Sequence, residues 1–254
     1  MEKSKFNALE ALKNSFIFYY KNFFNILIIY LPFFIPNLIL SLFFKVNYKN
    51  LLSLNIYILE YLLLLLLISI IIYPFEKITI YLYFYNKNIK EAYKESSKYY
   101  FGILFIYIIF LLISSSLIIL SLILSLIFSF PIFILTENFS LVFYSIIFLF
   151  IIFSIISLII TNKFFLSPLI YIFRRKIVFR SLKESWKIIN IKNATKIFLI
   201  QLIFYSIAII ILILQQILNI HLYLKILYVF ISTFFLIPIG GIFSLYIYQQ
   251  YQDK

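Results

Sequence analysis

The chain has 254 residues, of which 65% are hydrophobic and only 12% are charged. A soluble domain carries about 25% charged residues, so this composition excludes a water-soluble globule and a disordered chain, and the absence of cysteine excludes a disulfide scaffold. The net charge of +13 would favour nucleic-acid binding in a soluble protein, but here the basic residues lie between long apolar runs and indicate membrane topology instead.

Six apolar stretches follow one another along the chain, each long enough for a helix that crosses a bilayer. Such a helix needs about 20 mainly apolar residues, and the stretches cover residues 23–44, 56–75, 101–130, 139–161, 197–218 and 222–248. Runs such as the six leucines at 62–67 do not alternate as the strands of a β-barrel would. The sequence therefore predicts an all-α integral membrane protein with six transmembrane helices.

The basic residues are distributed unevenly on the two sides of these predicted spans. Nineteen of the 22 lysines and arginines fall at the termini, between spans two and three, or between spans four and five, and the other three are Lys45, Lys49 and Lys225. Because cytoplasmic loops accumulate Lys and Arg, this split predicts a multi-pass protein of the cell (cytoplasmic) membrane with both termini in the cytoplasm.

A short pattern recurs three times before the odd-numbered spans. It consists of a small residue, an apolar residue, Lys, a polar residue and Ser, and occurs at 11–15, 92–96 and 181–185. Each occurrence is followed by two spans and a proline, namely Pro74, Pro168 and Pro238. We predict a single polytopic membrane domain of three helical-hairpin units, at about 6–86, 87–177 and 178–254, each preceded by a cytoplasmic amphipathic helix. Chance matches in a chain rich in Ile, Phe and Lys are the alternative.

The predicted amphipathic helices carry basic residues on one face and apolar residues on the other. In the third, Trp186 shares a face with other apolar residues, whereas Arg180, Lys183 and Lys187 lie opposite, and Lys94 has the equivalent place in the second. Such helices lie among lipid headgroups and attract anionic lipid. We therefore expect a lipid-associated accessory or membrane-organising role with anionic headgroups as partners; a soluble protein docking on these helices is the alternative.

The residues that enzymes use are nearly absent. There is one histidine, His221, one aspartate, Asp253, and no cysteine, and three glycines cannot build a phosphate-binding loop. A hydrolase or transferase needs a nucleophile, a base or a metal site. We expect no enzymatic activity, no cofactor and no metal.

A small-solute or lipid transporter is the second reading of the sequence. Ionisable residues near the membrane interior often mark a transport path, and Glu76, Lys163 and Gln201 are the candidates for a site at the repeat interface. The other explanation is that Glu76 and Lys163 only mark where their spans meet cytoplasmic water, and that Gln201 bonds a neighbouring helix.

The third basic segment resembles a recurring element of the glycerophosphodiester phosphodiesterase membrane-domain family. The likeness rests on residues 181–187, on Asn190 and Asn193, on the elements around Pro168 and Pro238, and on Leu245-Tyr246. The chain differs in being poor in glycine. The resemblance implies a six-span membrane module without the separate catalytic domain that fused members carry.

Overall fold

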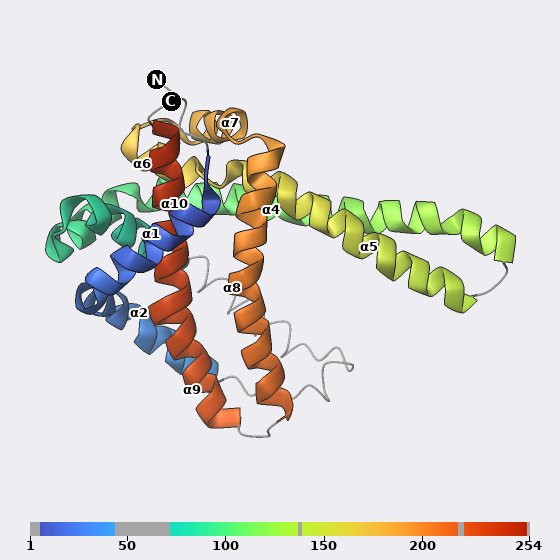
Figure 1. Cartoon of the computed structure of the whole chain (residues 1–254), viewed down its shortest axis with the longest axis horizontal. Coiled ribbons are helices and arrows are strands. Elements are labelled where there is room, and N and C mark those ends of the chain that lie inside the picture. Colours follow the sequence, from blue (N-terminus) through green and yellow to red (C-terminus); the bar gives the residue numbers. More distant parts are fainter. Residues whose placement is uncertain (1–5, 44–71, 137–138, 218–220, 253–254) are drawn as a thin grey trace. The chain divides into compact units, whose positions relative to one another are not determined.

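The computed structural model describes residues 6–43, 72–136, 139–217 and 221–252, nearly all of which lie in helices (Figure 1). No strand occurs among these residues, so the all-α class is confirmed. The elements in chain order are α1 (Ala8–Lys21), α2 (Phe23–Phe43), a helix described over 72–86, α4 (Ile89–Thr136), α5 (Phe139–Thr161), the 3₁₀-helix η2 (Asn162–Phe164), α6 (Ser167–Phe173), α7 (Val178–Ile188), α8 (Ile191–Ile217), α9 (His221–Ile231), the π-helical η3 (Ser232–Leu236) and α10 (Ile237–Gln252).

Three of the described helical segments are long and apolar enough to cross a membrane: Ile89–Ile132, Phe139–Phe173 and Ile226–Gln252. A fourth is the pair Ala8–Lys21 and Phe23–Leu38, if this pair, bent by 87°, forms one span. Many large apolar side chains on α4 and α5 are exposed, which suits contact with lipid better than contact with water. These findings fit the predicted membrane class, whereas the predicted span at 56–75 lies mainly outside the described residues.

The chain divides into two compact units. The first contains residues 1–104 and 199–254, and the second contains residues 105–198. These packing units do not coincide with the three predicted sequence units. The threefold repeat therefore stays a prediction.

In the first unit α1 packs against α10, which joins the two ends of the chain. The Asn7 backbone N–H donates to Gln250 Oε1 at 3.1 Å, and Gln250 Nε2 donates back to the Asn7 carbonyl at 3.0 Å. The Phe6 and Tyr251 rings stack at 5.6 Å. Asn7 also caps α1, because its side chain accepts from the Glu10 N–H at 3.2 Å. The first helix is thus fixed both to its own cap and to the last helix.

The corner between α1 and α2 is held by side-chain amides. Asn22 donates twice to the Phe18 carbonyl, from its backbone N–H at 3.1 Å and from its side-chain Nδ2 at 2.9 Å. The Tyr83 hydroxyl donates to Asn22 Oδ1 and accepts from Asn25 Nδ2. Nearby, Lys87 has a φ of 55° and lies 3.8 Å from the centroid of the Phe18 ring, and burial lowers the pKa of its ammonium.

The helix over 72–86 packs closely against α10 at two consecutive glycines. A methyl group placed on Gly241 would lie 2.9 Å from Ile80 Cγ2, closer than packed atoms approach. One turn further on, the Ser244 hydroxyl donates to Tyr81 Oη at 3.1 Å. Small residues at this crossing therefore allow the two backbones to approach.

A π-helical segment precedes Pro238 at the start of α10. Proline has no N–H, so Pro238 cannot donate the α-helical hydrogen bond to the Phe234 carbonyl. The Tyr19 hydroxyl of α1 donates to that carbonyl at 2.8 Å instead. The proline break and the packing of α1 are thus linked by one hydrogen bond.

In the second unit the later part of α4 and α5 form a helical hairpin (Figure 1). The Ser121 and Ser157 hydroxyls lie 2.9 Å apart and are buried, and the Phe128 and Phe153 rings lie 5.9 Å apart. The bounds of α5 are those predicted for the fourth span. After α5 the chain breaks at η2, and Pro168 opens α6, where its missing N–H is tolerated.

Candidate functional site

The exposed cations of α7 form the clearest candidate site in the second unit. Arg180, Lys183 and Lys187 are all exposed, whereas Ser181 and Leu182 on the opposite face are buried. Among the residues that the structure describes, the three cations form no ion pair; the ion pair of this helix joins Glu184 to Arg174. The cations are therefore available to an anionic ligand.

Ser185 fixes α7 to the break between α5 and α6. Its hydroxyl donates to the Lys163 carbonyl at 2.8 Å and accepts from the Leu166 N–H at 3.2 Å. These are backbone groups that the interrupted helix cannot pair within itself. Because Ser185 is completely buried, the cationic face of α7 has a defined orientation within its unit.

Trp186 is in contact with a cation and with a second ring. Lys163 Nζ is 3.8 Å from the centroid of the indole, and the Phe164 ring centroid is 5.0 Å away. Trp186 keeps 39% of its surface exposed, and Phe179 on the same helix keeps 65%. Exposed aromatic rings beside exposed cations are typical of helices at the membrane interface.

The three copies of the recurring pattern share one pattern of burial. The small residue and the serine of each copy are completely buried, namely Ala11 and Ser15, Ala92 and Ser96, and Ser181 and Ser185. The central lysine is exposed in each, so Lys94 on α4 corresponds to Lys183 on α7. Lys94 belongs to the first unit and the cations of α7 to the second.

The residues predicted for transport do not form one described site. Lys163 belongs to the second unit, where it lies on Trp186, while Glu76 and Gln201 belong to the first. Gln201 is half-buried on α8. Glu76 is only 1% exposed, and its Oε1 accepts from Asn37 Nδ2 at 3.4 Å.

Lys77, which the sequence analysis did not single out, is buried beside Glu76. Its Nζ donates to the Ile237 carbonyl at 3.0 Å and lies 3.6 Å from a methyl group placed on either Gly240 or Gly241. The sequence did contain one indication of this close packing, because two of the three glycines of the chain, Gly240 and Gly241, are adjacent. The close approach of two helices cannot be located from one helix alone, which is why the lysine was missed.

Comparison with protein-family models, with curated proteins and with solved structures gives no match. The resemblance to the glycerophosphodiester phosphodiesterase membrane-domain family therefore remains an expectation from short motifs. Within the described ranges, no group of three or more His, Cys, Asp or Glu side chains could hold a metal ion. The geometry of α7 is consequently the basis for a functional hypothesis.

Proposed function

We propose that the protein is a non-catalytic, six-span membrane protein that binds anionic lipid headgroups at the cytoplasmic surface. The observation that carries the proposal is the exposed row of Arg180, Lys183 and Lys187 next to the half-exposed ring of Trp186. Each such cation near an anionic surface contributes about 1 kcal/mol, and the ring favours the headgroup level. The shared burial of the recurring pattern supports a repeated construction in which Lys94 has the same role.

The only tryptophan of the chain allows a direct test of this lipid face. The protein is reconstituted with phosphatidylglycerol or phosphatidylcholine brominated on the acyl chain near the headgroup, and quenching of Trp186 fluorescence is compared. We expect stronger quenching by the anionic lipid. In the variant R180Q/K183Q/K187Q the preference for the anionic lipid should be much smaller, because the three exposed cations of α7 have been removed.

A matched control keeps the net charge change the same. The variant K13Q/K21Q/K98Q removes three exposed cations from α1 and α4, and it should retain the preference for phosphatidylglycerol at Trp186. Equal quenching by both lipids in the unmodified protein would reject the proposal.

The proposed orientation can be tested because the chain contains no cysteine. A membrane-impermeant maleimide applied to intact cells should not label a Lys183→Cys variant, whereas it should label Lys49→Cys in the predicted outer segment. The opposite labelling would invert the proposed topology. Permeabilised cells provide the control for reactivity.

A second candidate function, lipid transport, is favoured by the buried Glu76 and Lys77. Buried ionisable residues in membrane proteins often belong to transport paths. If the candidate is correct, proteoliposomes should move fluorescent phosphatidylglycerol between leaflets, as detected by dithionite bleaching, and E76Q/K77M should abolish that movement. Movement no faster than in protein-free vesicles would exclude this function.

A further inference from the structure

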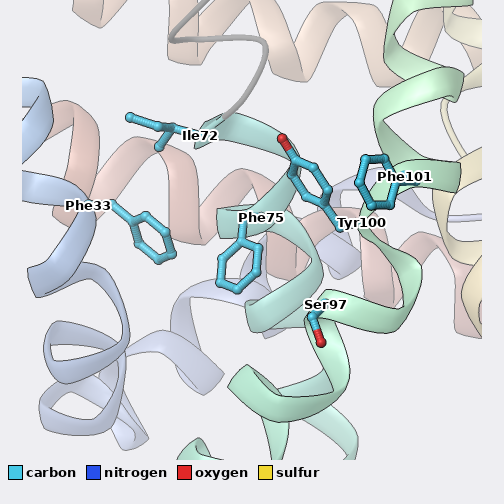
Figure 2. A pocket seen from close by; sticks show the side chains of 6 residues that line it. All are labelled: Phe33, Ile72, Phe75, Ser97, Tyr100 and Phe101. Atoms are coloured by element: carbon cyan, nitrogen blue, oxygen red, sulfur yellow. The ribbon is translucent and has the colours of Figure 1, made fainter.

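A pocket of about 390 Å³ opens in the first unit where three helices meet (Figure 2). Its lining comes from α2, the helix over 72–86 and α4, and consists of Phe33, Ile72, Phe75, Ser97, Tyr100 and Phe101. Four of these six side chains carry an aromatic ring, and Ile72 is aliphatic. The volume is within the range of about 300–1,000 Å³ usual for small-molecule pockets.

The aromatic rings of the pocket are packed against one another. Phe75 lies 6.0 Å from Phe33 and 6.2 Å from Tyr100, measured between ring centroids, and Tyr100 lies 5.4 Å from Phe101. Phe101 is nevertheless 78% exposed. One wall of the pocket thus remains open to an apolar occupant.

Two exposed lysines precede the pocket on the same face of α4. Lys90, Lys94, Ser97 and Phe101 follow the spacing of residues that share a helix face, and all four are exposed. With a rise of about 1.5 Å per residue, Lys94 lies about 10 Å along the axis from Phe101. The cations are therefore at the end of α4 that is predicted to be cytoplasmic, and the apolar wall is at the start of the predicted span 101–130.

This order of charge and apolar surface matches the order of groups in a membrane phospholipid. We propose that the pocket binds one acyl chain of an anionic phospholipid from the inner leaflet, with the phosphate held by Lys90 and Lys94. The phosphate is complementary to the two ammonium groups, and the acyl chain is complementary to the rings that line the pocket. This site deepens the proposed function, on which it rests, by naming a second, specific place of lipid binding.

The test uses phosphatidylglycerol with a photoreactive diazirine in one acyl chain, in nanodiscs that contain the full-length protein. After irradiation and digestion, mass spectrometry should find adducts on residues 72–75 and 97–101. The variant Ser97→Phe, at an exposed position that lines the pocket, should lose these adducts. Absence of adducts there in the unmodified protein would overturn the proposal.

Ser115→Phe is the matched control for this substitution. Ser97 and Ser115 are both exposed serines of α4, and each hydroxyl donates to the carbonyl three residues earlier, at 2.9 Å and 3.1 Å. Because Ser115 does not line the pocket, its variant should keep the adducts. Loss of adducts in both variants would mean that the introduced phenylalanine does not act by filling the pocket. This result would overturn the proposed binding of an acyl chain there.

The headgroup part of the proposal has its own measurement. At about 1 kcal/mol per cation, Lys94→Gln should lower the preference for phosphatidylglycerol over phosphatidylcholine adducts about fivefold, and K90Q/K94Q about 25-fold. The charge-matched variant K13Q/K21Q should leave the preference unchanged. Equal labelling by both lipids in the unmodified protein would overturn the anionic selectivity.

The experiments distinguish an error in the proposed pocket from an error in the proposed function of α7. Trp186 quenching reports on α7, whereas the adducts report on the pocket, and Ser97→Phe should not change the quenching. Selective quenching without pocket adducts would overturn the pocket and leave the lipid face of α7 intact. Pocket adducts without selective quenching would support the pocket and reject the proposed role of α7.

Discussion

Two amphipathic helices, α7 in the second unit and α1 in the first, pack against a proline break in different ways. On α7 the serine of the recurring pattern, Ser185, bonds the Lys163 carbonyl, five residues before Pro168. On α1 the corresponding serine, Ser15, only donates to the Ala11 carbonyl of its own helix, and Tyr19, one turn later, bonds the carbonyl four residues before Pro238. In both units a carbonyl near a proline break accepts from a hydroxyl of the amphipathic helix, but the position of the donor along that helix differs.

The largest difference should appear on α7, where one side chain serves two backbone groups. Ser185→Ala leaves both the Lys163 carbonyl and the Leu166 N–H without this partner, so we expect a loss of about 2 kcal/mol in the free energy of unfolding. Titration with dodecyl sulfate, followed by circular dichroism, measures it. Ser206→Ala, an exposed serine that bonds only its own helix, is the control, and an equal effect of both variants would contradict the assigned contacts.

On α1 the bond to a carbonyl near the proline break comes from Tyr19. Tyr19→Phe removes the donor to the Phe234 carbonyl while keeping the ring, so the expected loss is about 1 kcal/mol. Tyr20→Phe on the same helix changes a hydroxyl on a ring that is 84% exposed and should leave the unfolding midpoint unchanged. A larger effect at Tyr20 than at Tyr19 would exclude the proposed donor.

The cation above Trp186 on α7 should contribute a smaller amount. A double-mutant cycle with Lys163→Met and Trp186→Phe should give a coupling energy of about 0.5–1 kcal/mol, the usual range for a cation on an indole at an exposed site. The readout is again the free energy of unfolding. A coupling energy of zero would show that the two side chains do not interact in the folded protein.

The smallest effect should come from Ser15, the serine of the recurring pattern on α1. Ser15→Ala removes a bond only to the carbonyl of its own helix, which already takes part in the helical ladder, so a change below about 0.5 kcal/mol is expected. A loss as large as that of Ser185→Ala would show that Ser15 bonds another element, and the two helices would then be equivalent.

Several elements could be predicted from the sequence because their signals are local. The bounds of α5 agree with the predicted span 139–161, since a long apolar run needs no partner to identify it. The exposure of Lys94, Arg180, Lys183 and Lys187 agrees with helical periodicity. By contrast, the amphipathic helix and the span expected as separate elements at 87–130 form one helix, α4, in which no proline occurs before Pro131.

Other features depend on contacts between distant parts of the chain and could not be predicted. The bond from Tyr19 to Phe234 joins residues 215 positions apart, and the burial of Lys77 depends on two glycines on α10. Neither is visible in the periodicity of a single segment. The alternative of a transport site at Glu76, Lys163 and Gln201 and the count of six spans remain predictions.

The close crossing at Gly241 has a consequence for how this protein can vary among its relatives. Position 241 has no room for a methyl group as long as position 80 is isoleucine, so a larger residue at position 241 requires a change at position 80. A homologue with alanine at position 241 should carry a smaller side chain at position 80. Such paired changes in volume would let an alignment detect the helix crossing without any structure.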